Sequence, residues 1–363
     1  MKPVGVREIM GVPTLPPACV IKLSTQARGW VGRAHRSMVP PPVRVLEGLF
    51  GLLDYGALVA LDTLGLPAAL DRRMTVQELG TALQVPVDGL ERLVRYSATR
   101  GWLKFDRRGR VAPNSTTKFL RTAHPGGWSA WVPFLAGDEI VASVTSLGEA
   151  IRTDGDAFQL ANGATFFEWM ADNPARHRAF DEAMAAGGQM HGLTLARSLD
   201  WTTSRRVCDV GGGDGALLRT LLAKHPHLSG VVLDLPEVTA RSKPAERLES
   251  LAGDAFQQVP ADCDTYLFVN VLHDWDDDDA IRLLERAASD GPAGARIVVV
   301  EGRRSSRPAD DIAARTDLLM LALAPGGRER TGQQFETLGH RAGLRLDKTV
   351  SLASTDYAHV FTH

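Results

Sequence analysis

Apolar and polar positions change their rhythm near residue 206. Beyond it, short runs rich in Val, Ile and Leu alternate with amphipathic stretches of about ten to fifteen residues. Such alternation is typical of parallel strands joined by crossover helices, with both faces of the sheet covered. We therefore expect residues 201–363 to form a doubly wound α/β domain. The predicted strands are 205–210, 229–235, 265–272 and 295–302, the predicted helices are 215–226, 238–251 and 278–290, and a terminal antiparallel hairpin is predicted in 344–363.

The region upstream of this domain has a helical pattern followed by a wing. Apolar residues recur at helical spacing in 50–70 and stop at Gly65 and Pro67. A short helix, a turn and an amphipathic helix follow, and extended runs at 102–105 and 110–113 then flank a turn. This order predicts a winged helix-turn-helix domain.

A winged helix-turn-helix has two functional interpretations. Arg92, Arg95 and Arg100 on its second helix could contact DNA phosphates. Asp88 and Glu91 lie among these arginines, however, and no strongly basic face builds up. The pattern therefore favours a dimerisation or packing domain over a DNA-binding module.

Residues 123–200 are predicted to be mostly helical and contain many aromatic and Met residues. Such a stripe is usually core, but here it precedes a cofactor-type turn, so part of it is a candidate wall of an apolar pocket. Prolines at 13, 16 and 17 interrupt the only apolar stretch near the start where a signal-peptide core could lie, so this segment is expected to be a disordered arm, or upstream sequence with the true start near Met38. The expected divisions are a disordered arm (1–40), a winged-helix dimerisation domain (41–122), a helical linker and substrate-pocket segment (123–200) and the cofactor-binding catalytic domain (201–363).

Composition and charge exclude several classes of protein. The chain of 363 residues is 44% hydrophobic and 23% charged, as expected of a globular protein with two domains. A net charge of -2 gives no global reason to expect a nucleic-acid partner. Three widely spaced cysteines indicate neither a disulfide framework nor a cysteine zinc site. No apolar run is long enough to span a membrane, so we expect a cytoplasmic protein with no membrane partner.

The stretch "VCDVGGGDGALL" (207–218) places a glycine-rich turn after a predicted strand. Gly211 and Gly213 match the dinucleotide-binding fingerprint, so a nicotinamide dehydrogenase is one interpretation. Asp209 argues against it, because its carboxylate would repel a pyrophosphate in a partly desolvated cleft. The same carboxylate attracts a cofactor that carries an ammonium and a sulfonium, such as S-adenosyl-L-methionine. Asp214 adds to this preference, and no Lys or Arg lies within the stretch.

Two further acids follow the next strands. Asp234 is expected to bind the ribose hydroxyls, and Asp254 the adenine amine, with Phe256 beside the adenine ring. Each acid alone would be interpreted as a solvated loop residue. Because the carboxyl ends of parallel strands meet at one crevice, the sequence predicts an acidic cofactor site there.

His273 follows the predicted strand 265–272 at the same edge of the sheet. A histidine has a pKa suited to proton removal near neutrality, although a lone loop histidine is most often a surface residue. Glu301 ends the next strand, where a buried carboxyl needs a partner, and it would fix the histidine's tautomer. The acidic run 276–279 is explained by helix capping and the helix dipole, so no metal is predicted.

Taken together, these motifs resemble those of the S-adenosylmethionine-dependent O-methyltransferases of the caffeic acid and acetylserotonin type, which include bacterial polyketide-tailoring enzymes. The matching segments are "DVGGGDG", "DLPEV", "GDAF", "LHDWDDDDA", "VVEG" and "APGGRERT". The resemblance extends from about Pro41 to the C-terminus. It implies a Rossmann-like class I methyltransferase domain preceded by a winged-helix domain that dimerises and does not bind DNA.

The resemblance also implies roles for individual residues. His273 matches the family's general base, and Glu301 and Glu329 match the two glutamates that hold it. Met184 resembles a methionine near the acceptor, with plain helix packing as the alternative. Many members have Lys or Arg near the adenine three or four residues before the histidine, whereas this chain has Asn270 and Val269, so the adenine contacts are left open.

The predicted function is transfer of a methyl group to a hydroxyl of an aromatic small molecule, such as a polyketide in secondary metabolism, by a homodimer. The alternatives are N- or C-methylation on the same fold, and a winged-helix DNA-binding regulator. The histidine and its two glutamates favour oxygen methylation.

Overall fold

The computed structural model describes residues 16–122, 124, 128–240, 242, 245–307 and 313–363. The chain forms two compact units. The first is built mainly from residues 32–137, and the second from 138–363 together with the helical segment 18–31.

Helix α1 (Ala18–Met38) occupies most of the segment that we expected to be a disordered arm. The structure differs from that expectation because the prolines at 13, 16 and 17 all precede the helix, and the residues after them have helical spacing of apolar side chains. Several of these side chains, including Val20, Leu23 and Trp30, are exposed. Residues 1–15 of the expected arm lie outside the described residues.

The first unit contains the predicted winged helix-turn-helix. Strands β1 (Lys104–Phe105) and β2 (Val111–Ala112) pair antiparallel, as the sequence predicted. Gly65 adopts a left-handed conformation with φ +63° after the long helix, which suits glycine. The helices are α2 (Pro41–Leu49), α3 (Gly51–Thr63), α4 (Leu66–Ala69), α5 (Val76–Leu83), α6 (Val87–Thr99), α7 (Ser115–Phe119) and α8 (Trp131–Leu135).

The arginines considered as DNA contacts are paired with acids. On α6, Arg92 lies 3.1 Å from Asp88, and Arg95 lies 2.8 Å from Glu91. Arg100 lies 2.7 Å from a carboxylate of α3. Each of the three arginines therefore has an acidic partner within this unit.

The second unit opens with a helical segment, as predicted for this part of the chain. Its aromatic stripe packs largely on itself: the ring of Phe166 lies 5.3 Å from the rings of both Phe158 and Phe180, edge to face. Much of the stripe is therefore core. The helices are α9 (Asp138–Thr145), α10 (Leu147–Thr153), α11 (Ala157–Asn162), α12 (Phe166–Asp172) and α13 (Pro174–Ser198).

A seven-stranded sheet forms the centre of the second unit, in the order β10-β11-β7-β6-β3-β4-β5. Five strands are parallel, and the terminal hairpin places β11 antiparallel to β7, as predicted. The strand order reverses direction between β3 and β6, which is where such sheets bind ligands. The strands are β3 (Arg206–Val210), β4 (Ser229–Asp234), β5 (Leu248–Ala252), β6 (Thr265–Val269), β7 (Arg296–Glu301), β10 (Arg345–Ser351) and β11 (Tyr357–Thr362).

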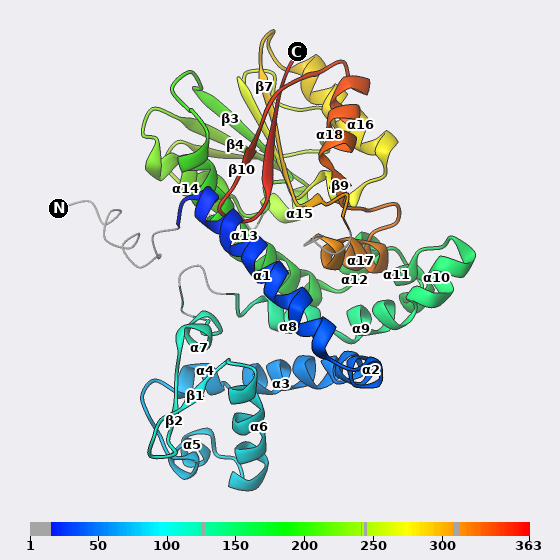
Figure 1. Cartoon of the computed structure of the whole chain (residues 1–363). Helices are drawn as coiled ribbons and strands as arrows, with labels where there is room; N and C mark the ends of the chain where they lie inside the picture. The colour runs from blue at the N-terminus through cyan, green and yellow to red at the C-terminus, as the bar shows by residue number, and fades with distance from the viewer. Residues whose placement is uncertain (1–15, 123, 125–127, 241, 243–244, 308–312) are drawn as a thin grey trace, which may run out of the picture. The chain divides into compact units, whose positions relative to one another are not determined.

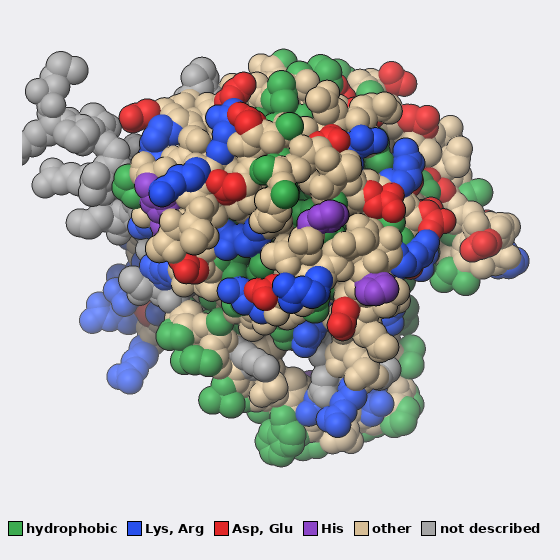
Figure 2. All heavy atoms as spheres, turned by 90° about the horizontal axis from the view of Figure 1, so that it is seen from above, with side chains coloured by type: hydrophobic (Ala, Val, Ile, Leu, Met, Phe, Trp, Pro, Cys, Tyr) green, Lys and Arg blue, Asp and Glu red, His purple; other side chains and the backbone are tan. Residues whose placement is uncertain are grey.

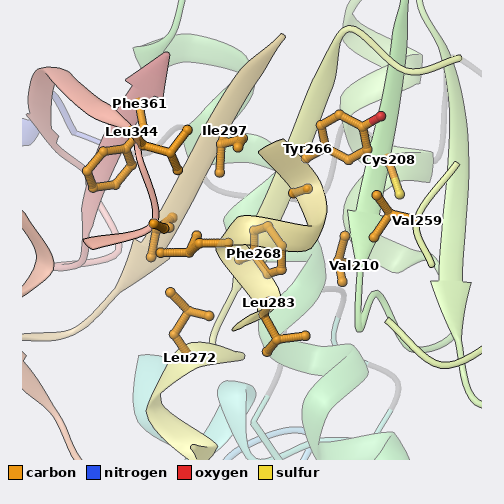
Figure 3. Close-up of a cluster of buried hydrophobic side chains, with 14 of the residues drawn as sticks. Cys208, Val210, Val259, Tyr266, Phe268, Leu272, Leu283, Ile297, Leu344 and Phe361 are labelled. Atoms are coloured by element: carbon orange, nitrogen blue, oxygen red, sulfur yellow. The ribbon is translucent and has the colours of Figure 1, made fainter. Parts of the chain in front are cut away.

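The two faces of the sheet bury different side chains. Cys208 and Val210 of β3 pack with α16 (Asp277–Asp290) and α18 (Gly332–Arg341), as Figure 3 shows for the side chains of this cluster. Val207, one position away, packs on the opposite face with α14 (Ala216–Lys224) and the end of α13. Figure 1 shows these helices on the two sides of the sheet. This two-residue period confirms the doubly wound interpretation.

One predicted helix is wrong. The stretch 238–251 was expected to be a crossover helix, but its end belongs to β5, which pairs parallel with β4, and the helix that the described residues show just before β5 is the short α15 (Pro236–Thr239). The pattern in "LESLA" fits a strand as well as a helix, and pairing with β4 decides the outcome. Elements that the sequence had not predicted include α18, the 3₁₀ turn η3 (Leu272–Asp274), α17 (Ala314–Leu323), and the parallel pair β8 (Arg303–Arg304) and β9 (Arg330–Thr331).

The surface carries mixed charge. On the face displayed in Figure 2, the acidic and basic side chains of the described residues are interspersed. Across the described part of the chain, no helix combines the length and apolar character needed to cross a bilayer.

Candidate active site

The glycine turn between β3 and α14 is built around the side chain of Asp209. Gly211 and Gly213 have φ values of +69° and +60°, which L side chains rarely adopt. A Cβ on Gly212 would lie 2.7 Å from the carboxyl carbon of Asp209, so the backbone lies directly on that carboxyl group. The amide of Gly213 donates a 2.8 Å hydrogen bond to Asp234 at the end of β4, which ties the turn to the neighbouring strand.

Asp209 is a buried acid with an unsatisfied oxygen. It is 2% exposed, and its Oδ2 has no hydrogen-bond partner among the described residues. Burial, followed by the negative charges of Asp234 and Asp214, raises the pKa of Asp209 to about 8. A cation placed against this carboxyl would satisfy the oxygen and stabilise its ionised form, which fits the ammonium of S-adenosyl-L-methionine.

Within the described part of the chain, Asp214, unlike Asp209, has a basic partner for its carboxylate. Arg219, just beyond the stretch searched for basic residues, forms a 2.6 Å ion pair with Asp214. The expectation that both acids of the turn lack a basic partner is therefore wrong for Asp214. The first turn of α14 brings the guanidinium back over the loop, a contact between neighbouring elements that a count along 207–218 misses.

The other two expected cofactor acids follow adjacent parallel strands. Asp234 ends β4 and Asp254 follows β5, where it is exposed and accepts a 2.9 Å hydrogen bond from the amide of Phe256. Phe256 packs edge to face on Trp275 at 4.8 Å, with the guanidinium of Arg282 5.0 Å from its ring centre. The predicted acids thus lie at neighbouring strand ends, and their individual cofactor contacts remain predictions.

The end of β6 has an unusual backbone conformation at one of the two positions where the sequence departs from the resembled family. Val269 is the last residue of β6, and Asn270 has a left-handed φ of +53°. Asparagine tolerates this conformation better than most residues with a side chain. Asn270 therefore serves to turn the chain toward His273, and the adenine contacts at this position stay open.

His273 lies in η3 between two buried glutamates. Its Nδ1 is 3.1 Å from Glu301 Oε2 and 3.5 Å from Glu329 Oε1. Glu301 is 0% exposed and Glu329 is 3% exposed. The structure therefore brings together the three residues that the sequence pointed to.

Two opposing effects determine the protonation of His273. Burial by itself lowers the pKa of the imidazole, but the negative charges of Glu301 and Asp274 and the contact with Glu329 outweigh it, so the pKa lies well above the usual value. Burial raises the pKa of Asp274 to about 6. The imidazole is thus a strong base held by carboxylates.

Glu301 has a second task in the structure. While its Oε2 faces the imidazole, its Oε1 accepts hydrogen bonds from the amides of Val271 and Leu272, at 3.0 and 2.8 Å. One carboxylate therefore fixes both the loop and the ring that the loop carries.

The sequence reasoning missed Arg330. Its side chain is 0% exposed and contacts the loop around His273. The only signal in the sequence was an arginine directly after Glu329 in "RERT", and an arginine in a polar segment usually lies at the surface.

The acidic run 276–279 caps and begins α16, as predicted. Asp276 is the N-cap residue, and its side chain accepts a 2.9 Å hydrogen bond from the amide of Asp279. Elsewhere, the side chains of His273, Glu301 and Glu329 bring ligand-type atoms within 4.8 Å of one another. An imidazole and two carboxylates are groups that a divalent cation accepts as ligands.

Met184 lies on α13 and is half-buried. It is distant in sequence from His273, Glu301 and Glu329. One turn further along, a Cβ on Gly188 would lie 3.5 Å from Ala216, the first residue of α14. The helix that carries Met184 therefore packs against the helix that follows the glycine turn. Its role at an acceptor pocket stays a prediction.

Comparison with known proteins places this site in context. Residues 144–345 match the family described as O-methyltransferase domain. The chain is similar to O-methyltransferase SfmM3 of Streptomyces lavendulae, with 31% identity over 84% of this chain and 96% of that protein. It is also similar to 8-amino-8-demethylriboflavin N,N-dimethyltransferase of Streptomyces davaonensis, with 31% identity over 80% of this chain and 86% of that one.

A solved structure adds information on ligands. The O-methyltransferase NcsB1 from neocarzinostatin biosynthesis was crystallised with S-adenosyl-L-homocysteine and 1,4-dihydroxy-2-naphthoic acid. It matches this chain with a TM-score of 0.68 and 28% identity, over 87% of this chain and 98% of that one.

Proposed function

Because the chain belongs to the O-methyltransferase family whose domain spans residues 144–345, we propose that it methylates a phenolic hydroxyl of an aromatic, polyketide-type metabolite with His273 as general base. The observation that carries this proposal is the buried cluster of His273, Glu301 and Glu329 at the sheet edge that also holds Asp209. It combines a strong base with an acidic site for a cationic donor.

S-adenosyl-L-methionine supplies a methyl group on a positively charged sulfur atom. The chain's residues then have separate tasks: Nε2 of His273 takes the proton of the acceptor hydroxyl, while Glu301 and Glu329 on the Nδ1 side stabilise the imidazolium. Asp209 binds the ammonium of the methionine moiety. Holding the acceptor in line contributes up to about 7–11 kcal/mol to lowering the barrier, and the base about 10²- to 10⁴-fold in rate.

The test is a comparison of His273→Ala with His340→Ala, whose histidine is exposed on α18. We expect the first variant to lose about 10²- to 10⁴-fold in kcat with nearly unchanged affinity for S-adenosyl-L-homocysteine, and the second to behave as wild type. The probe is 1,4-dihydroxy-2-naphthoic acid with methyl-labelled donor, and the readout is a product heavier by one CH₂. Equal losses of kcat and cofactor affinity in the first variant would contradict the assignment.

N-methylation is the second candidate, because one similar protein is named as an N,N-dimethyltransferase. An arylamine loses its proton only after it has become an ammonium, which is acidic, so a strong base contributes less to the rate. Paired phenol and aniline probes of the same ring separate the two activities. Preference for the amine, with little dependence on His273, would replace oxygen methylation as the function.

We also propose that a second copy of this chain covers the apolar surface of α2 and α3. The exposed side chains there are Val43, Val45, Leu46, Leu49, Phe50, Leu52 and Leu53. A cluster of this kind at a helix surface is typical of an interface.

Light scattering after gel filtration tests the dimer. We expect the wild type to have twice the mass of one chain, and Leu49→Glu with Leu52→Glu to shift the protein to a single chain. Leu160→Glu, at an exposed leucine of α11 in the other unit, serves as control and should leave the mass unchanged. A wild-type protein that elutes as a single chain at micromolar concentration would overturn the proposal.

A further inference from the structure

Arg330 is a fully buried arginine in the strand that follows Glu329. Its side chain is 0% exposed. Removing a guanidinium from water is unfavourable unless each face of the charge finds an acceptor, so an arginine is rarely kept in such a place without a structural or functional reason.

The guanidinium of Arg330 is satisfied by the loop that carries His273. Its Nη1 donates to the carbonyl of Leu272 at 2.6 Å, and its Nη2 donates to the carbonyl of Trp275 at 2.8 Å. Its Nε donates to Asp277 at the start of α16, at 2.9 Å. The planar fork thus holds the backbone on both sides of the histidine.

The main chain next to Arg330 adds another hydrogen bond to this loop. The amide of Arg328 donates a 2.8 Å hydrogen bond to the carbonyl of His273 itself. Gly327 allows this approach, because a Cβ there would lie 2.9 Å from that carbonyl oxygen. Segment 327–330 therefore binds three carbonyls of the loop.

The loop is fixed from the opposite side as well. Glu301 accepts from the amides of Val271 and Leu272, and the Leu272 side chain is buried in the core cluster drawn in Figure 3. Glu301 thus accepts from two amides of the loop, whereas the segment around Glu329 donates to three of its carbonyls, two of them through Arg330.

We propose that Arg330 is a positioning residue for His273, which sets the height and tilt of the imidazole so that Nδ1 lies between the two glutamates. This inference rests on the proposed role of His273 as the base. Arg330 lies behind the loop and acts only through it. Because Glu329 is its neighbour in the chain, one short segment places the base and one of its carboxylates together.

The experiment compares Arg330→Lys and Arg330→Met with Arg341→Met. Arg341 pairs with Asp278 at 2.9 Å near the same end of α16 but is half exposed, which makes it a matched control. We expect Arg330→Met to lose about 10- to 100-fold in kcat, since misplacing a reacting group by about 1 Å has effects of that size. Lysine, with one nitrogen, cannot hold two carbonyls and Asp277 and should recover only part of the rate.

Three further readouts separate positioning from simple loss of stability. The affinity for S-adenosyl-L-homocysteine should stay at the wild-type value in both variants. The ascending, acidic limb of the profile of kcat against pH should move to lower pH, because an imidazole displaced from Glu301 and Glu329 loses the charges that raise its pKa. In an additional variant, Arg330→Ala, added methylguanidinium should restore part of the rate, whereas the same concentration of sodium chloride should not.

A folded Arg330→Lys with wild-type kcat and an unmoved pH limb would overturn the proposal. If the Arg330 variants do not fold, Asp277→Asn, which weakens one of the three contacts at a partly exposed residue, takes their place. It should lower kcat and move the pH limb in the same direction, and an unchanged profile would again refute the inference. His273→Ala is measured in parallel: full activity there would refute the base itself, whereas its loss beside a normal Arg330→Lys would refute only the positioning role.

Discussion

Replacing Asp209 with asparagine should raise the free energy of unfolding of the free protein and lower its affinity for the cofactor. In the folded chain the pKa of Asp209 is raised to about 8, mainly by burial, whereas in the unfolded chain it is about 3.9. Between these values the unfolded chain releases the proton and the folded chain keeps it. Stability contributed at this site is therefore lost as the pH rises from about 4 to about 8.

The size of the effect follows from the two pKa values. At pH 7 the difference spans roughly 3 pH units at 1.36 kcal/mol each, or about 4 kcal/mol of lost stability. Asparagine does not ionise, but its buried amide lacks partners and costs about 1–3 kcal/mol. We therefore expect Asp209→Asn to gain about 1–3 kcal/mol at pH 7, which corresponds to about 2–10 °C in Tm for a domain of this size. The gain should vanish near pH 5.

Cofactor binding should change in the opposite direction. In the wild type the arriving ammonium favours ionised Asp209, so affinity rises about tenfold per pH unit up to pH 8 and a proton is released on binding. A hydrogen bond to a charged group contributes about 1.5–3 kcal/mol. The asparagine variant should accordingly bind S-adenosyl-L-homocysteine roughly 10- to 100-fold more weakly at pH 8, with no proton release.

Thermal unfolding at pH 5, 6, 7 and 8, and calorimetry in two buffers of different ionisation enthalpy, measure both effects. Asp88→Asn is the control, because this exposed carboxylate pairs with Arg92 on α6, in the other unit, and its removal should leave both effects at Asp209 unchanged. A Tm difference between Asp209→Asn and wild type that is the same at every pH, or equal affinity of the two proteins for the ligand, would refute the reasoning.

Three other perturbations test neighbouring features. Glu329→Gln removes a carboxylate 3.5 Å from His273 and should move the acidic, ascending limb of kcat against pH to lower pH; a profile that does not move would contradict the charge coupling. Gly192→Ala should destabilise the protein by about 1–3 kcal/mol, since its Cβ would lie 2.6 Å from the carbonyl of Leu217, whereas Gly187→Ala on the same helix has open space and should be neutral or stabilising in a denaturant titration. Incubation with EDTA should leave kcat unchanged while added zinc inhibits by competing with the proton of the imidazole, and a loss of activity in EDTA would show that a metal takes part.

Local patterns in the sequence predicted most of the fold. The β-branched runs predicted the parallel strands, and the last twenty residues predicted the hairpin of β10 and β11. These elements are decided by periodicity and turn residues within a few positions. The stretch 238–251 was assigned wrongly because "LESLA" suits both a helix and a strand, and only its pairing with β4 distinguishes them.

The sequence predicted which residues form the site, but it did not predict the contacts that they make. His273 and Glu301 could be found because each follows a predicted strand at the same edge, and Glu329 because of the family resemblance. The pairing of Arg219 with Asp214, and the contact of Arg330 with a loop more than fifty residues earlier, depend on how separate elements pack. No spacing rule along a single segment reports such distant contacts.

The close packing of α13 on α14 has a consequence for the order in which ligands bind. Glycines at 188 and 192 bring the second half of α13 against the helix that starts at the glycine turn, while Met184 lies one turn before Gly188. An unbroken helix of 25 residues is close to 40 Å long and bends little. We expect any displacement of the turn on binding of the methyl donor to be transmitted along this helix to Met184, the predicted acceptor-pocket residue, so that the acceptor binds second and the methylated product leaves first.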